Sequence, residues 1–206
     1  WAGGIWLARL CPGTLTRKPR GYSGKPGYWC DLGVLAFTFM GDARRWTFKL
    51  LIYRFRTYDN QHYVTLETTP GTTIGNCQAK DNLSSSDTPS NVEFPYGFFR
   101  FRIEGIGIGS VTSATIHLPV GETIDTYYRY GPTSNNTNSH WYEFLYDAQT
   151  GAEINGDIIT LYFVDSLRGD DDLTANGIVI DVGGPGISLN LIPNDNDSQV
   201  VNSSED

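Results

Sequence analysis

The sequence predicts an all-β fold, an antiparallel β-sandwich of the jelly-roll or immunoglobulin-like type. Short apolar or alternating segments recur about every 10 to 15 residues, with turn-forming residues between them. No segment has apolar residues at helical spacing. The composition agrees, because 23 Gly, 12 Tyr, 10 Phe and 5 Trp against a single Met in 206 residues are typical of strands and tight turns.

The first predicted strands lie at 34–40, 46–58 and 62–68. The first two are rich in aromatic and branched residues, which favour strands. The third alternates most clearly, since Val64 and Leu66 fall on one face and polar or aromatic residues fall on the other. These three segments therefore predict a β-rich beginning that is followed by the main domain.

The clearest strand of the second half is 98–104, in which three apolar residues alternate with two arginines and a glutamate. The glycines at 105, 107 and 109 end this strand, and Asn155-Gly156 is typical of a hairpin turn before 158–164. Further strands are predicted at 111–118, 126–130, 141–146, 158–164 and 178–182, with a polar loop at 131–140.

The alternation also predicts which side chains form the core, because every second residue of a strand faces the same side of the sheet. Four polar residues, Arg100, Arg102, His117 and Glu143, are expected to face outward. The residues expected to face inward are Phe99, Phe101, Ile103, Ile116, Leu118, Phe144, Ile159, Leu161, Phe163, Ile178 and Ile180.

Charge is unevenly distributed along the chain and suggests three parts. Residues 1–60 hold ten of the 15 Lys and Arg residues but only three of the 23 Asp and Glu residues. We expect a basic N-terminal segment at 1–60, partly β or irregular, and a β-sandwich domain at 61–187. An acidic disordered tail is expected at 188–206. A short basic arm on an acidic domain explains the asymmetry better than a nucleic-acid-binding arm does.

The cysteines and the hydropathy of the sequence bear on the compartment in which the protein resides. The three cysteines, Cys11, Cys30 and Cys77, cannot all pair within one chain. A bond between Cys11 and Cys30 would close a loop in an oxidising compartment. No apolar run approaches the roughly 18 to 20 residues that a membrane-spanning helix needs.

An acidic stretch between two predicted strands is the first candidate site. Its adjacent carboxylates repel one another unless water, an arginine or a cation compensates them. Calcium takes about six to eight oxygen ligands, which loop carboxylates supply, although the spacing is not that of an EF-hand. The other interpretation is a solvated acidic turn in which Arg168 pairs with one of the aspartates. The candidate ligands of Ca²⁺ are Asp165, Asp170, Asp171, Asp172 and Asn176.

Aromatic residues offer a second candidate site. Tyr130 and Trp141 flank the predicted 131–140 loop and are candidates for an exposed face that stacks on sugars. The alternative is that these aromatic side chains fill the core. No combination of nucleophile, base and metal ligands is visible, and no G-x-S-x-G motif is present, so we expect no enzyme.

Six blocks carry a resemblance to a known family. They read PGTTIGNCQAKDN at 70–82, VEFPYGFFRFRI at 92–103, ATIHLP at 114–119, TYYRYGPT at 126–133, HWYEFLYDAQTGAEI at 140–154 and GDIITLYFVDSLRGDDDLTANGIVIDVGGP at 156–185. Residues 63–185 thus resemble the bacterial choice-of-anchor U domain. The resemblance implies a folded module of an exported bacterial protein, next to a C-terminal sorting or anchoring signal. It implies no catalytic residues.

These observations favour a non-catalytic, extracytoplasmic module of a bacterial surface or secreted protein with a spacer or presentation role, for which calcium is a candidate stabiliser. Its expected location is the cell surface or the extracellular space, and its expected partners are the cell envelope or an extracellular glycan or protein. A second hypothesis is a carbohydrate- or ligand-binding sandwich that uses exposed aromatics. A weaker third is a jelly-roll subunit of an assembly.

Overall fold

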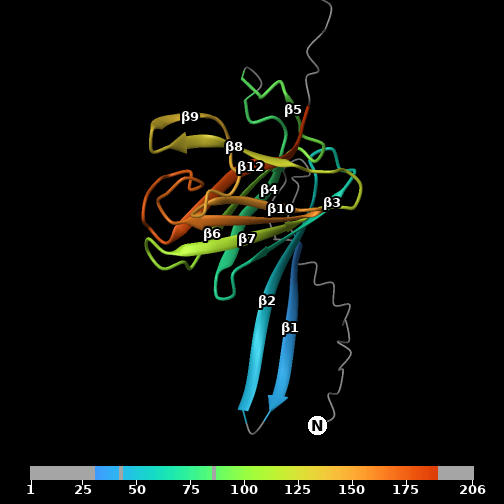
Figure 1. Ribbon diagram of the computed structural model, residues 1–206. Helices are drawn as coiled ribbons and strands as arrows, with labels where there is room; N and C mark the ends of the chain where they lie inside the picture. Colours follow the sequence, from blue (N-terminus) through green and yellow to red (C-terminus); the bar gives the residue numbers. More distant parts are fainter. Residues whose placement is uncertain (1–30, 42–43, 85–86, 190–206) are drawn as a thin grey trace, which may run out of the picture.

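The computed structural model describes residues 31–41, 44–84 and 87–189, with side chains from Ile52 onward. Within these ranges the chain forms twelve strands and no helix, in two antiparallel sheets, which confirms the predicted all-β sandwich (Figure 1). No described segment forms a helix that would cross a membrane. The predictions for residues 1–30, including the Cys11–Cys30 bond, and for the tail after residue 189 fall outside these ranges.

The first sheet has the order β1-β2-β3-β7-β11-β10, and all its neighbours are antiparallel. Its middle strands alternate buried and less buried residues, which is typical of a sheet with one face on the core. The strands are β1 (Asp31–Gly41), β2 (Arg44–Arg56), β3 (Tyr63–Thr68), β7 (Val111–His117), β11 (Ile158–Val164) and β10 (Gly151–Asn155).

The second sheet has the order β4-β6-β12-β8-β9, and the short strand β5 also pairs with β12. The long β12 is its central element, because it pairs with β6 over its first half and with β8 over its second. The strands are β4 (Thr73–Lys80), β5 (Val92–Glu93), β6 (Phe98–Glu104), β8 (Thr126–Thr133), β9 (Asn136–Glu143) and β12 (Ile178–Ser188).

Side chains from both sheets meet in one buried cluster. Phe55 of β2 and Phe99 of β6, for example, make an edge-to-face contact with their ring centres 5.3 Å apart. Arg100 and Glu143 are exposed, as expected, while Arg102 and His117 are half-buried. The predicted core residues that are buried are Phe99, Phe101, Ile103, Ile116, Leu118, Phe144, Ile159, Leu161 and Phe163.

The predicted facing of β12 is wrong. Ile178 and Ile180 are half-buried, whereas Val179 and Asp181 are fully enclosed and lie opposite Ile103 and Phe101 of β6. Residues paired across a strand share a face, so β12 presents Val179 and Asp181 to the core. Apolar character alone predicts that Ile178 and Ile180 face the core. Asp181 faces the core instead because its ion-pair partner, Arg129, is buried there.

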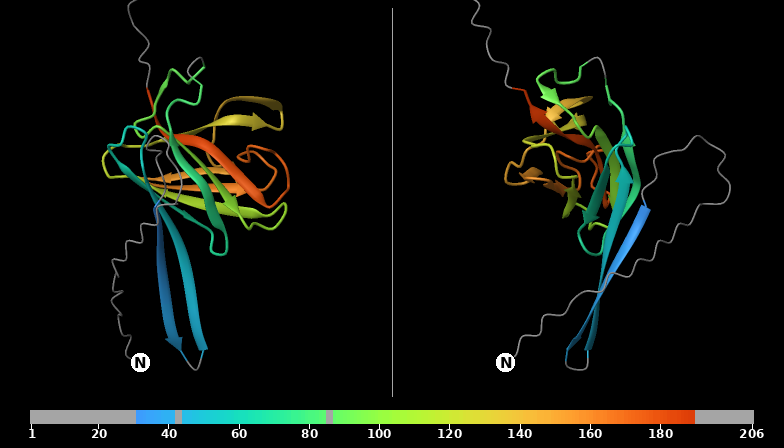
Figure 2. Two further views of the ribbon diagram at one scale, coloured as in Figure 1. Left: turned by 180° about the vertical axis from the view of Figure 1, so that it is seen from behind. Right: turned by 90° about the vertical axis from the view of Figure 1, so that its right-hand side faces the viewer.

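The N-terminal segment reaches into the sandwich. Strand β2 pairs with β3 over Ile52–Arg56, and Phe55 is 2% exposed within the core, so the packed unit begins before the boundary expected at residue 61. Before that point, β1 and β2 pair only with each other and project from the body as a two-stranded ribbon (Figures 1 and 2).

The polar segment 131–140 was expected to be a loop and is instead a β-hairpin. Strand β8 continues to Thr133, and β9 starts at Asn136, with Gly131 opposite His140 and Thr133 opposite Asn136. The hairpin therefore extends beyond the rest of the second sheet, as Figure 1 shows. Polar residues occupy its exposed tip, which explains why hydropathy alone indicated a loop.

An ion pair is buried between the sheets. Arg129 of β8 and Asp181 of β12 are 1% and 0% exposed, and Arg129 Nε lies 2.7 Å from Asp181 Oδ1. The Tyr127 hydroxyl donates to Asp181 Oδ2 at 2.9 Å, while Arg129 donates to the Tyr142 hydroxyl and to the Ile180 carbonyl, each at 2.8 Å. Burial raises the pKa of the Asp181 carboxyl, and the Arg129 charge and Tyr127 hydroxyl oppose that rise.

Removing one partner of this pair should be strongly destabilising. Arg129→Met leaves the Asp181 carboxylate buried without its cation, so we expect a loss of about 3–5 kcal/mol in the free energy of unfolding. Arg102→Met breaks the half-buried pair with Glu104, which water reaches, and should cost at most about 1 kcal/mol. Urea denaturation of the full chain measures both. Equal losses in the two variants would contradict the structural role assigned to the buried pair.

Candidate functional site

The acidic stretch connects β11 to β12, and its first carboxylate is a buried acceptor of backbone hydrogen bonds. Asp165 is 0% exposed. Its Oδ2 accepts from the amides of Gly109 and Gly177 at 2.8 and 2.9 Å, and its Oδ1 accepts from the Asn176 amide at 3.4 Å. Because Gly109 lies between β6 and β7, this single side chain joins two connections at one end of the sandwich. Charged acceptors make such bonds stronger than neutral ones do.

Asp170 has a similar role within the loop. Its two carboxylate oxygens accept from the amides of Ser166 at 3.0 Å and Ile180 at 3.2 Å, which holds the loop against the start of β12. Burial raises the pKa of this carboxyl, although the two amide hydrogen bonds oppose the rise. Asp170 is therefore held by backbone groups on both oxygens.

The next two aspartates point to different neighbours. Asp172 is exposed and accepts from the Thr174 amide at 2.9 Å and the Asn176 side-chain amide at 2.8 Å. Asn176 in turn accepts from the Ile178 amide at 2.9 Å. The Asp171 carboxylate lies against Gly131 of β8, where an added Cβ would come within 2.6 Å of Oδ1. The candidate ligands are thus near one another in sequence, but they face separate partners.

Arg168 reaches away from the aspartate triplet. Its guanidinium donates to the carbonyls of Leu145 and Thr150 at 2.9 Å each and forms an ion pair with Asp147 at 2.9 Å. It also lies 4.8 Å from the ring centre of Phe144, a cation–π contact. The expected pairing of Arg168 with an aspartate of its own loop is wrong, because the side chain instead fastens the loop to the β9–β10 connection.

Within the part of the chain that the structure describes, no three His, Cys, Asp or Glu side chains gather closely enough to hold a metal ion. Backbone amides engage Asp165, Asp170 and Asp172 directly, which accounts for the presence of carboxylates in this loop. Calcium binding by Asp165, Asp170, Asp171, Asp172 and Asn176 stays a prediction, and the melting experiment below tests it.

The predicted ligand residues Tyr130 and Trp141 lie side by side on the outer face of the second sheet. Both are half-buried, with their ring centres 5.2 Å apart. Trp141 also contacts Phe98 at 5.1 Å and stacks on Phe94 at 6.0 Å, and its indole N–H donates to the Ser84 carbonyl at 3.4 Å. We call Phe94, Phe98, Tyr128, Tyr130 and Trp141 the aromatic cluster. It is a partly covered cluster and not an open platform.

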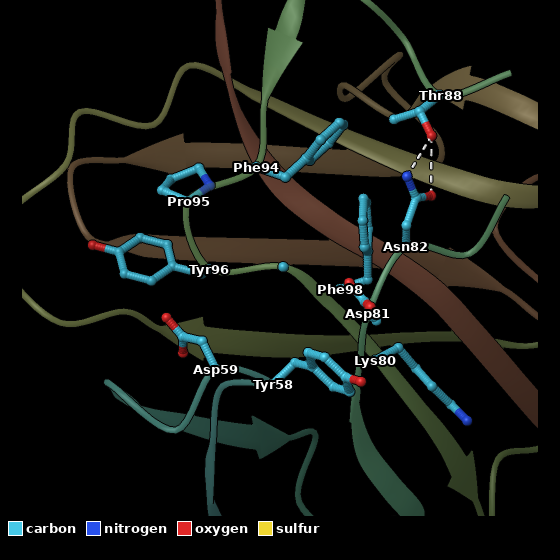
Figure 3. Close-up of a pocket in the computed structure, with 11 residues that line it drawn as sticks. Tyr58, Asp59, Lys80, Asp81, Asn82, Thr88, Phe94, Pro95, Tyr96 and Phe98 are labelled. Atoms are coloured by element: carbon cyan, nitrogen blue, oxygen red, sulfur yellow. Dashed lines mark hydrogen bonds between the residues drawn. The ribbon is translucent and has the colours of Figure 1, made fainter. Parts of the chain in front are cut away.

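A pocket of about 330 Å³ adjoins the aromatic cluster, and Phe94 and Phe98 belong to both (Figure 3). The β2–β3, β4–β5 and β5–β6 connections form it, together with Lys80 at the end of β4 and Phe98 at the start of β6. The sequence indicated only loops and a bend in these places, so the pocket was not predicted. The lining residues are Tyr58, Asp59, Lys80, Asp81, Asn82, Thr88, Phe94, Pro95, Tyr96, Gly97 and Phe98.

Comparison with known proteins adds no relative. No family model, no curated protein and no solved structure matches the chain.

The hydrogen bonds of Asp165 predict a graded response to neutralising the loop carboxylates. Asp165→Asn replaces one acceptor oxygen by an amide that faces backbone N–H groups, so we expect a loss of about 1–3 kcal/mol in the free energy of unfolding. Asp172→Asn, at an exposed position, should cost well under 1 kcal/mol. Chemical denaturation compares the two. A larger loss for Asp172→Asn would contradict the assigned roles.

Thermal unfolding with EDTA and then with millimolar Ca²⁺ tests the calcium prediction. A calcium ion bound only to the folded state raises the midpoint. A rise that disappears in Asp171→Ala or Asp172→Ala would support a metal site. An unchanged midpoint would leave the loop held by its own hydrogen bonds.

The pKa values of two aspartates should lie on opposite sides of the ordinary aspartate pKa of 3.8. Burial raises the pKa of Asp170, whereas the Thr150 and Gln149 amides and Arg168 lower the pKa of the exposed Asp147 carboxyl. Between pH 3.8 and its raised pKa, Asp170 binds more protons in the folded state than in the unfolded state. Its contribution to the free energy of unfolding therefore falls as the pH rises. Asp147 makes stability fall as pH drops through its lowered pKa. Carboxyl ¹³C NMR titration measures both, and an unraised Asp170 would contradict the assignment.

Proposed function

We propose that the chain is a non-catalytic, extracytoplasmic module of a bacterial surface or secreted protein, with a spacer or presentation role next to a C-terminal anchor. The observation that carries this proposal concerns the 156–185 block, which gives the choice-of-anchor U resemblance. Its polar residues are engaged in holding the fold: Asp165 and Asp170 bind backbone amides, Arg168 binds carbonyls, and Asp181 pairs with Arg129. Residues used in this way support a structural role.

A spacer must keep its shape outside the cell, where no chaperone repairs it, and the contacts described above favour that property. The connections at one end of the sandwich are fastened by charge-assisted hydrogen bonds, and the two central strands of the second sheet are joined by a buried ion pair. Local opening of these connections would break several bonds at once. The arrangement therefore favours a rigid module.

A cysteine supports the extracytoplasmic location. Cys77 of β4 is disulfide-bonded and 8% exposed. Disulfide bonds persist in oxidising compartments such as the periplasm and the cell exterior and are rare in the cytosol. The chain's other cysteines, Cys11 and Cys30, lie outside the described residues.

The location is tested in cells that produce the full-length protein. We expect antibodies against residues 61–187 to label intact cells, and external protease to remove that labelling. Cys77 should react with a maleimide reagent only after reduction and denaturation. A cytoplasmic protein with a free cysteine serves as the control. Protection from protease in intact cells, together with a Cys77 thiol that reacts without reductant, would contradict the proposal.

A further inference from the structure

We infer that the pocket between the β2–β3 connection, the end of β4 and the β5–β6 connection is a binding site for a saccharide unit, such as the end of an extracellular glycan chain. This inference goes beyond the spacer role, because a module that only separates other domains needs no ligand. It rests on three features of the pocket: its size and position, its aromatic wall, and its polar groups that have spare hydrogen-bonding capacity among the described residues.

The pocket has the dimensions and placement of a small-ligand site. Its volume of about 330 Å³ is at the lower end of the range of about 300–1,000 Å³ that is usual for such sites. Its residues come from connections, which a rigid sandwich holds in place, as in many binding domains. Figure 3 shows Tyr58 and Asp59 from the β2–β3 connection facing the residues that precede β6.

One wall of the pocket is aromatic and held in position from behind. Phe98 is 4% exposed, and its ring lies 4.7 Å from Phe94 and 5.1 Å from Trp141. Phe94 in turn stacks on Trp141. Phe94 is half-buried, so it is the ring of this wall that the apolar C–H face of a pyranose can contact. Trp141 and Tyr130 do not line the pocket, so in this site they position the aromatic wall instead of touching the ligand.

The lining also carries polar groups with spare hydrogen-bonding capacity. Within the described ranges, the side chains of Lys80 and Asp81 form no hydrogen bond or ion pair. Asp59 uses Oδ1 to accept from Thr57 and Gln61, which leaves Oδ2 available. Lys80 supplies donors, and the two carboxylates supply acceptors. A hydroxyl group both donates and accepts, so a polyol satisfies this combination.

The charges of the lining exclude the simplest other ligands. Asp59 and Asp81 outnumber Lys80, so a phosphate or another multiply charged anion would be repelled. A fully apolar ligand would remove water from three charged groups without replacing its hydrogen bonds, which is unfavourable. A neutral, hydroxyl-rich ligand with one apolar face fits both the aromatic wall and the polar side.

A glycan array probed with the full chain, followed by calorimetric titration of the best-bound oligosaccharide, tests the inference. We expect saturable binding, and we expect Lys80→Ala and Asp81→Ala each to weaken it at least about tenfold, which corresponds to one or two lost hydrogen bonds. Neither side chain has a hydrogen-bond or ion-pair partner among the described residues, so the melting temperature should not change.

The matched control is Asp157→Ala, at an exposed carboxylate in the β10–β11 turn that does not line the pocket. It should bind as the original chain does. Absence of binding to every array glycan, or binding that Lys80→Ala and Asp81→Ala leave unchanged, would overturn the inference. Neither result depends on where the protein resides in the cell, so the extracytoplasmic proposal is tested separately.

Discussion

The buried contact between Arg129 and Asp181 constrains the rest of the second sheet. Both charged groups are buried away from water, and burial of either one without the other is strongly unfavourable. A slip of β12 by one residue would turn Ile180 inward and Asp181 outward and leave Arg129 buried alone. The ion pair therefore fixes the register of β12 between β6 and β8, although the apolar pattern of β12 favours the opposite face. Tyr127 and Tyr142 complete the hydrogen bonding around the pair.

The acidic connection extends this arrangement to one end of the sandwich. Asp165 binds the amides of Gly109 and Gly177, and Arg168 binds carbonyls of the β9–β10 connection, so connections from both sheets are held together. Carboxylates that satisfy backbone donors inside a fold have a structural purpose and need no ligand. The acidic stretch between β11 and β12 is thus explained by the hydrogen bonds through which it holds the connections together. The melting experiment still tests the calcium prediction.

The pocket lies at the opposite end of β6. Apart from Phe98 at the start of β6, its residues come before this strand, whereas the fastened connections come after it. A sandwich whose connections are fastened at one end holds the pocket at the other end in a fixed shape, and β12 also ends on the pocket side, where Ser188 pairs with Val92. The two proposals are therefore compatible, since rigidity would position the pocket and the pocket would give the spacer a partner.

By itself the sequence determined the all-β class and nine of the eleven expected core residues, because alternation along a strand is a local property. It also placed the acidic stretch between two strands. The facing of Ile178 and Ile180, the strands in 131–140 and the direction of Arg168 were decided by the tertiary structure. Each depends on a partner distant in sequence, as Asp181 depends on Arg129. The pocket was decided in the same way, because its walls come from separate connections that only the folded sheets bring together.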